Sequence, residues 1–119
     1  LMWVVDPLLD QAFKVIDAWG FKYKTVGFTW AKTNRKSMGF FTGLGYWTRA
    51  NPEMCLLATR GKPKRNSKSI PQLVVEQRQE HSRKPDIVYN HIENMLDGPY
   101  VELFARRKRN NWHSWGNEV

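Results

Sequence analysis

The stretch KTVGFTWAK, residues 24–32, decides what kind of fold the chain can form. Val26, Phe28 and Trp30 occupy every second position, with threonine or glycine between them. Successive side chains of a β-strand point to opposite faces, so this alternation predicts a strand with one apolar face. We expect the three apolar side chains to point together into a core.

Strands and helices are expected to alternate along the rest of the chain. Four further stretches predict strands: LMWVV (1–5), MCLLATR (54–60), QLVVEQ (72–77) and YVELFARR (100–107). A helix is expected to start with Asp6 as its N-cap and Pro7 in its first turn, and to end at Gly20. A second helix is expected from Pro85 onward, and Gly98 follows its end. This alternation indicates an α/β fold in which helices connect the strands of a sheet.

The composition limits the classes of protein. A chain of 119 residues forms a single domain, and 41% hydrophobic residues exclude a disordered chain. The formal net charge of +8 favours an anionic partner such as nucleic acid. No apolar run approaches the ~20 residues of a membrane span, so we expect no membrane partner. The one cysteine, Cys55, lies in an apolar run, which indicates a core thiol and a reducing compartment.

The chain begins inside an apolar, β-branched run and has no polar lead-in. A buried strand of this kind normally has neighbours on both sides. We therefore expect further residues to precede Leu1 in the natural protein, so that residues 1–119 form one partial domain.

The segment EHSRKPDIVYNHIENML, residues 80–96, places cations where a helix is already positive. The N-terminus of a helix carries a partial positive charge and free N–H groups, which together attract anions. The cations either bind a carboxylate or phosphate, or extend into solvent while Glu80 and Asp86 offset their charge. The cations concerned are His81, Arg83 and Lys84.

Glu102 interrupts the apolar strand expected at residues 100–107. A buried carboxylate needs a partner such as a hydroxyl group or an arginine. Near the C-terminal end of a parallel strand it could bind ribose hydroxyl groups, because ligands of α/β sheets bind in the crevice there. On an edge strand it would face water instead.

Two loops carry groups that suit nucleic acid. The loop at residues 40–53 is rich in glycine and aromatic residues. Its Tyr46, Trp47 and Arg49 could stack on unpaired bases and neutralise phosphate, or they could cover the sheet. The loop at residues 60–69 is either a phosphate-binding patch or a solvated charged surface. Its cations are Arg60, Lys62, Lys64, Arg65 and Lys68.

Metal and nucleophile signatures are missing from the sequence. His81, His91 and His113 lack metal-ligand spacing with any cysteine or carboxylate cluster, so no metal site is expected. There is no nucleophile elbow, and the GLG at residues 43–45 is not followed by the Gly-Lys-Ser/Thr of a phosphate loop. His91 falls beside the apolar side of the expected second helix, where a core or half-exposed position fits.

Six stretches carry a family resemblance when they are taken together and in order. They are MWVV, AWGFKYKTVGFTWAKTN, GYWTRANPEMCLLATRGKP, EHSRKPDIVYNHIE, VELFAR and WHSWGNEV. This set resembles the METTL-type adenine methyltransferases, the family that includes the mRNA adenosine methyltransferase and many bacterial and phage DNA enzymes. The resemblance implies a Rossmann-like S-adenosylmethionine-dependent methyltransferase fold, incomplete at its N-terminus.

The resemblance also implies a cofactor site. In the family, the lysine of the Lys-Pro-Asp element contacts the methionine end of S-adenosylmethionine, and Lys84 stands at that position. The ribose and adenine are held at positions that correspond to Arg106, Asn117 and Glu118, with Glu102 as a supporting carboxylate. An acidic ligand end also agrees with a cationic helix start.

One departure from the family concerns catalysis. The family's Asp-Pro-Pro-Trp motif accepts hydrogen bonds from the adenine amine and stacks on the extruded base, and this motif does not occur in the chain. Asp6 and Pro7 are followed by two leucines and are better explained as a helix start. We expect the catalytic residues upstream of Leu1 and none within the chain, which alone would be inactive.

The function implied by the resemblance is transfer of a methyl group from S-adenosylmethionine to the 6-amino group of adenine in nucleic acid. DNA is favoured over RNA as the substrate. A non-catalytic nucleic-acid-binding partner subunit and an inactive fragment of such an enzyme are the alternatives. The protein could form a homo-oligomer or a hetero-oligomer, and the sequence leaves its oligomeric state open. The expected location is the cytoplasm of a prokaryotic or viral host cell, or the nucleus of a eukaryote. Nucleic-acid contacts are expected at Tyr46, Trp47, Arg49, Lys62, Lys64 and Arg65.

Overall fold

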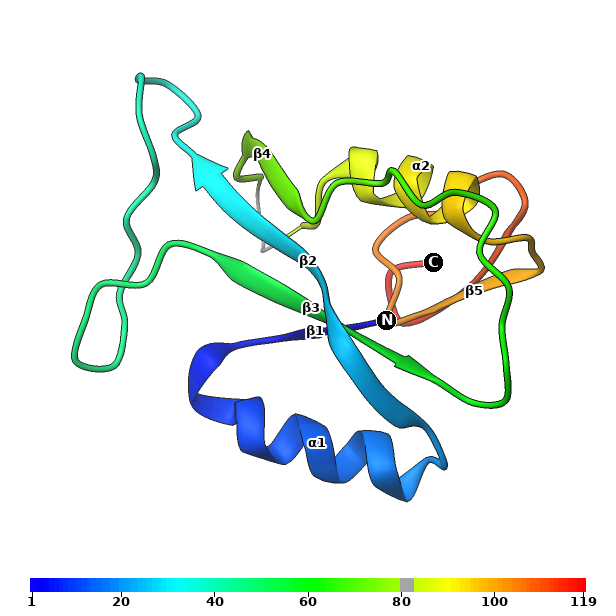
Figure 1. The fold of residues 1–119 in the computed structure, drawn as a ribbon. Coiled ribbons are helices and arrows are strands. Elements are labelled where there is room, and N and C mark those ends of the chain that lie inside the picture. Colours follow the sequence, from blue (N-terminus) through cyan, green and yellow to red (C-terminus); the bar gives the residue numbers. More distant parts are fainter. Residues whose placement is uncertain (80–82) are drawn as a thin grey trace.

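The computed structural model describes residues 1–79 and 83–119, and its elements follow the predicted order (Figure 1). The strands are β1 (Met2–Val4), β2 (Lys22–Thr33), β3 (Glu53–Thr59), β4 (Leu73–Gln77), β5 (Tyr100–Leu103) and β6 (Trp112–Trp115). The helices are a 3₁₀ turn, η1 (Asp6–Leu8), and two α-helices, α1 (Leu9–Ala18) and α2 (Asp86–Met95). The five predicted strands and both predicted helices are confirmed. The polar tail gave no sign of β6.

β2 lies inside a four-stranded sheet whose strand order is β1-β3-β2-β4. It pairs antiparallel with β3 and parallel with β4. The expectation that helices connect the strands is wrong for β2 and β3, and also for β3 and β4, which residues 60–72 join without a helix. Residues 34–52 join β2 and β3 as a loop without a helix, so the chain returns in the opposite direction. β5 and β6 form a separate parallel pair, so the strands belong to two sheets.

Helices cover both faces of the four-stranded sheet (Figure 1). On one face, Phe28 and Trp30 form a buried cluster with Val88 of α2. On the other face, Leu56 packs in a buried cluster with Ile16 of α1. The result is a three-layer arrangement of helix, sheet and helix, which confirms a mixed α/β fold.

A β-bulge at Gly27 changes the predicted facing of the central strand. From Val26 to Phe28 the pairing advances by two residues on β2 but by only one on β3, where Cys55 is the partner of Phe28. Val26 therefore packs on the α1 side of the sheet, whereas Phe28 lies on the α2 side. A Cβ on Gly27 would lie 3.3 Å from the carbonyl oxygen of Cys55, which favours glycine here. The expectation of one shared face is wrong for Val26.

The helix ends differ from the predictions in detail. Asp6 is the first residue of the 3₁₀ turn, so the positions before η1 and α1 are Val5 and Leu8, and neither forms a side-chain cap hydrogen bond. The predicted Asp6 cap is therefore wrong. Gly20 ends the first helix as predicted and has a φ of +81°, which glycine adopts without strain. Pro85 is the N-cap of α2, directly before the first helical residue.

The second sheet has large apolar side chains that are open to solvent. β5 ends at Leu103, before the predicted strand end, because Phe104 adopts a φ of +60°. The N–H group of Ala105 then donates a hydrogen bond of 2.9 Å to the carbonyl of Trp115. Val101 and Leu103, which share one face of β5, are 64% and 48% exposed.

Phe28→Ala is expected to lower the free energy of unfolding by about 3–5 kcal/mol. The ring is 1% exposed, so its removal leaves a cavity between the sheet and α2. Urea unfolding followed by circular dichroism measures the change. Phe40→Ala removes the same atoms from a ring that is 60% exposed and should change stability by under about 0.5 kcal/mol. Equal losses in the two variants would contradict the core position of Phe28.

Candidate functional site

Lys84 lies against an acidic side chain at one end of the four-stranded sheet. Its Nζ atom donates a hydrogen bond of 2.6 Å to Oε1 of Glu53, and Oε2 of Glu53 lies 2.8 Å from Nζ of Lys32. The side chains of Lys84, Glu53 and Lys32 are 23%, 12% and 20% exposed. Two ammonium groups thus share one carboxylate, and the cluster keeps a net positive charge. We call these three residues the Lys–Glu–Lys cluster.

Strand pairing explains how the Lys–Glu–Lys cluster forms. Glu53 is the first residue of β3 and pairs with Trp30 near the end of β2, which brings Lys32 beside it. Lys84 comes from the residues just before α2. An indole ring supports each ammonium group. Nζ of Lys84 lies 5.3 Å from the ring centre of Trp3, and Nζ of Lys32 lies 5.5 Å from that of Trp30.

The two lysines set the charge of Glu53. Burial raises the pKa of this carboxyl group, but the hydrogen bonds and charges of Lys32 and Lys84 more than offset burial and hold the pKa below its ordinary value. Glu53 is therefore ionised at neutral pH. Sequence reasoning missed Glu53 and Lys32. The signals were a glutamate directly before an apolar strand and a lysine directly after an alternating one.

Glu102 has the hydroxyl partner that a partly buried carboxylate needs. It accepts a hydrogen bond of 2.6 Å from the hydroxyl group of Tyr89 on α2. β5 is an edge strand of its two-stranded sheet, as the alternative expected, but the side chain is half-buried and contacts the helix instead of facing water. Burial, and then the neighbouring Glu102 carboxylate, raise the pKa of Tyr89, so its hydroxyl group stays a donor.

Two of the three predicted residues near the C-terminal end are in direct contact. Nε of Arg106 donates a hydrogen bond of 2.9 Å to Oε2 of Glu118. Gly116 permits the close approach of the two segments, since a Cβ there would lie 3.0 Å from backbone atoms of Ala105. Asn117 is exposed next to them. The structure thus groups Arg106 with Glu118 and, separately, Lys84 with Glu53.

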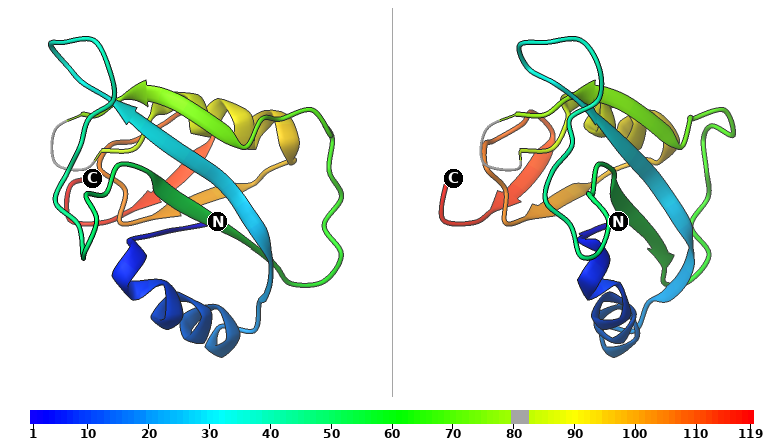
Figure 2. Two further views of the ribbon diagram at one scale, coloured as in Figure 1. Left: turned by 60° about the vertical axis from the view of Figure 1, so that its left-hand side comes forward. Right: turned by 90° about the vertical axis from the view of Figure 1, so that its left-hand side faces the viewer.

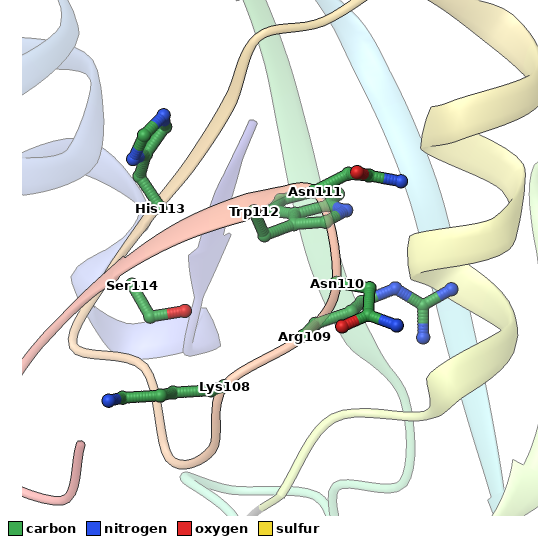
Figure 3. A pocket seen from close by; sticks show the side chains of 7 residues that line it. All are labelled: Lys108, Arg109, Asn110, Asn111, Trp112, His113 and Ser114. Atoms are coloured by element: carbon green, nitrogen blue, oxygen red, sulfur yellow. The ribbon is translucent and has the colours of Figure 1, made fainter.

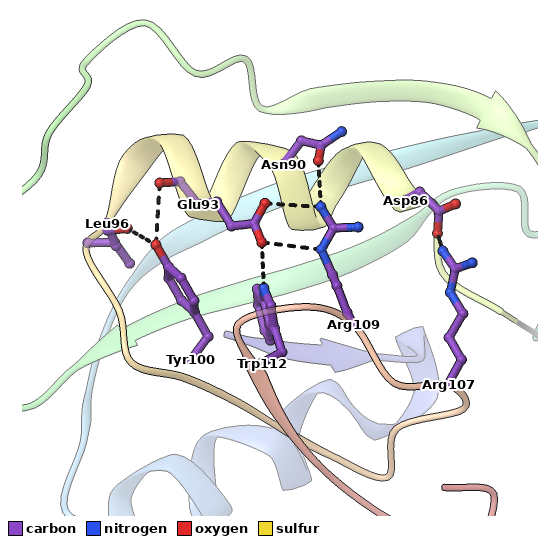
Figure 4. A network of polar contacts seen from close by, with 8 residues as sticks. All are labelled: Asp86, Asn90, Glu93, Leu96, Tyr100, Arg107, Arg109 and Trp112. Atoms are coloured by element: carbon purple, nitrogen blue, oxygen red, sulfur yellow. Dashed lines mark hydrogen bonds and ion pairs between the residues drawn. The ribbon is translucent and has the colours of Figure 1, made fainter.

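Polar contacts that the sequence did not predict fix the second sheet to α2 (Figure 4). Glu93 accepts hydrogen bonds of 3.0 and 3.2 Å from the guanidinium group of Arg109, and one of 2.7 Å from the indole N–H of Trp112. These bonds lower the pKa of Glu93. Arg109 also donates to Asn90 at 2.6 Å. Arg109 gave no signal of its own, because it lies in a run of four cations.

Two hollows lie beside the loop that leads into β6. One, of about 430 Å³, is lined by residues 108–114, whose side chains surround it in Figure 3. The other, of about 390 Å³, lies between this loop and Glu93. Lys84 and Asn117, both expected to contact the cofactor, line neither of them. The first hollow is cationic, whereas the second is polar and holds the paired charges of Glu93 and Arg109, and both lie next to the contacts between Arg109 and α2.

The loop residues predicted to bind nucleic acid are exposed but fall into two groups. Tyr46 is 79% exposed and Trp47 is fully exposed. Their loop projects from the end of the sheet at which β2 ends and β3 begins, and Glu53 and Lys84 lie at that end (Figure 1). Arg49 lies on the same loop.

The basic loop extends from the opposite end of the sheet (Figure 2). It follows the last residue of β3, and the N–H group of Asn66 donates a hydrogen bond of 2.7 Å to the carbonyl of Met95 at the end of α2. The structure therefore does not bring the two predicted groups together. The basic-loop residues predicted to contact nucleic acid, all exposed, are Lys62, Lys64 and Arg65.

The cations before α2 have acidic partners. Arg83 forms an ion pair of 3.5 Å with Asp86, and Arg107 also contacts Asp86. This agrees with the hypothesis that Asp86 offsets part of the charge, whereas Lys84 has Glu53. The predictions for Glu80 and His81 lie outside the described residues.

The remaining predicted residues have structural positions. His91 stacks on Phe28 with ring centres 6.0 Å apart, as expected for a half-exposed histidine beside the core. Cys55 is buried, and burial raises the pKa of its thiol to about 12. Among residues 1–79 and 83–119, no three His, Cys, Asp or Glu side chains gather as a metal site would require. In the same residues no helix is long and apolar enough to cross a membrane.

Comparison with known proteins places the sequence in a family. Residues 1–118 match the protein-family model described as MT-A70. The chain belongs to the MT-A70 family. Type II methyltransferase M.MunI of Mycoplasma sp. is 32% identical over 121 residues, which cover 99% of this chain and 49% of that protein. The resemblance predicted from the six stretches is therefore confirmed.

Two eukaryotic relatives extend the comparison. A putative N(6)-adenosine-methyltransferase MT-A70-like protein of Medicago truncatula is 32% identical over 122 residues, with 99% of this chain and 20% of that protein covered. The human N(6)-adenosine-methyltransferase catalytic subunit METTL3 is 28% identical over 123 residues, with 99% and 21% covered. The MT-A70 chain thus spans about half the length of the Mycoplasma relative and about a fifth of the other two.

Acidification is expected to remove the stability that Glu53 gives this MT-A70 chain. Folding lowers the pKa of Glu53, so its contribution is fully present above the ordinary carboxyl value of 4.5 and is lost as the pH falls through the lowered value. Urea unfolding of the unchanged chain and of Glu53→Gln between pH 7 and pH 3 should give a difference that shrinks on the acid side. Glu76→Gln, on an exposed residue, should give no such trend. A difference that stays constant with pH would refute this linkage.

Proposed function

We propose that this MT-A70 chain takes part in S-adenosylmethionine-dependent methyl transfer to the 6-amino group of adenine in nucleic acid, with DNA as the first substrate to test. The observation that carries the proposal is the position of Lys84. Its ammonium group is held at 2.6 Å from Glu53 in a cluster with a net positive charge, at the same end of the sheet as the exposed aromatic loop. Relatives named as N(6)-adenosine methyltransferases support the position on adenine.

The donor set fits the two ends of the proposed cofactor. S-adenosylmethionine, when bound, supplies an electrophilic methyl group on a sulfonium sulfur. The Lys–Glu–Lys cluster suits the carboxylate of its methionine end, because Lys84 has donors beyond the one that Glu53 accepts. Glu102, half-buried and oriented by Tyr89, suits the ribose hydroxyl groups. We assign Arg106, Asn117 and Glu118 to the nucleoside end of the cofactor. We also propose that the chain is part of a Rossmann-like fold that binds this cofactor.

The aromatic loop is assigned to the substrate. Tyr46 and Trp47 offer exposed rings on which extruded or unpaired bases can stack, and Arg49 offers a cation for phosphate. The groups that accept hydrogen bonds from the adenine amine are proposed to lie before Leu1 in the longer protein. The absence of Asp-Pro-Pro-Trp from these 119 residues favours one second candidate, a non-catalytic nucleic-acid-binding subunit.

Lys84→Ala is expected to weaken S-adenosylmethionine binding by ~1.5–3 kcal/mol, the scale of a hydrogen bond to a charged group. Isothermal titration calorimetry measures the change. Lys14→Ala, which removes an exposed lysine from α1, should leave the affinity unaltered. Equal affinity in the Lys84 variant, with the fold intact, would remove Lys84 from the cofactor site.

The reaction itself is tested with labelled S-adenosylmethionine and adenine-containing DNA and RNA of equal sequence. We expect label on the 6-amino group with the longer protein and little or none with residues 1–119 alone. Cofactor binding without transfer by the longer protein would support the non-catalytic subunit. Robust transfer by the 119 residues would show that they contain the acceptor groups.

Reversing the charges of Lys62, Lys64 and Arg65 to glutamate should flatten the salt dependence of binding to a long DNA. The slope of log K against log salt concentration falls by ~0.9 for every phosphate that the protein no longer neutralises. Reversing Lys14, Lys22 and Lys24, also exposed, changes the net charge equally and is the control. An equal effect of both triple variants would indicate a general charge effect and no basic-loop contact.

A further inference from the structure

We propose that Glu53 is a positioning residue that orients Lys84 toward the carboxylate of the cofactor. This inference rests on the proposed function, since it concerns how the same site is organised. Glu53 accepts from Lys84 through Oε1 and pairs with Lys32 through Oε2, so each carboxylate oxygen serves one lysine.

Glu53 is well placed to hold a lysine in one orientation. It begins β3, which has partners on both sides in the sheet, and its side chain is 12% exposed. A lysine side chain carries about 2 kcal/mol of rotamer entropy, so an unattached ammonium group would sample many positions. The contact with Glu53 and the ring of Trp3 together restrict Lys84 before any ligand arrives.

Lys32 completes this arrangement on the side of the aromatic loop. Its backbone N–H group donates to the side-chain oxygen of Asn51 at 3.2 Å, and the Asn51 amide donates back to the Lys32 carbonyl at 3.1 Å. The Asn51 amide also contacts the carbonyl of Phe41 on the same loop. Lys32 is therefore fixed through its backbone, and its ammonium group in turn fixes Glu53.

Charge, as well as shape, decides what Glu53 does. Without its negative charge, the two ammonium groups would repel each other across a site that water only partly screens. Glutamine in its place keeps the size of the side chain but offers one neutral acceptor for two cations. We expect Lys84 then to lose its fixed orientation. The affinity should fall only for ligands that contact Lys84.

Two nucleosides separate positioning of Lys84 from a general effect on the fold. S-adenosylhomocysteine carries the amino-acid end of the cofactor, and 5′-methylthioadenosine carries the same nucleoside without a carboxylate. The affinity of both is measured by calorimetry on the whole protein for the unchanged chain, Glu53→Gln, Glu53→Asp and the exposed control Glu76→Gln. Melting temperatures are recorded in parallel.

We expect Glu53→Gln to bind S-adenosylhomocysteine about five- to tenfold more weakly and methylthioadenosine as before. This loss is smaller than that expected for Lys84→Ala, because Lys84 is still present and only its orientation is lost. Glu53→Asp keeps the charge and should lie between. An equal loss for both ligands, or no loss for S-adenosylhomocysteine, would overturn the proposal. Binding of neither ligand by the unchanged protein would instead overturn the cofactor proposal, and this inference with it. If Glu53→Gln does not fold, the comparison of the two ligands rests on Glu53→Asp.

Discussion

The pairing of β2 with β3 is the constraint on which the rest of the structure depends. β3 separates β1 from β2, and residues of both paired strands supply the buried clusters under the two helices. The same pairing places the first residue of β3 opposite Trp30, and so carries Glu53 to Lys32. One strand register therefore fixes the layering of the fold and the charge arrangement at one end of it.

The bulge at Gly27 decides which helix each apolar residue of β2 packs against. An ideal strand would present Val26, Phe28 and Trp30 to the same helix. One unpaired residue redirects the strand, so Val26 faces α1 while the next two apolar residues face α2. β2 can in this way contribute to both sides of the core, as a central strand covered on two faces must.

Local sequence patterns predicted what local physics determines. Alternation around Phe28 predicted β2, and proline and glycine signals at Pro85 and Gly20 predicted helix boundaries. The bulge could not be predicted, because it is set by register against β3, which is distant in sequence. The same holds for the contacts of Glu53, since a glutamate before a strand has no defined partner until the fold brings two lysines to it.

Glu102 shows the same difference between what the sequence predicts and what only the fold determines. The need of Glu102 for a hydroxyl partner followed from elementary electrostatics, but the identity of Tyr89 required the packing of α2 against the second sheet.

Val101 and Leu103 give the second sheet a practical importance. These two side chains form no hydrogen bonds with water, and covering them releases the surrounding water at a gain in free energy. We therefore expect a purified sample of these 119 residues to self-associate as its concentration rises. Its elution from a sizing column should then depend on how much protein is loaded, and dilute preparations will behave best.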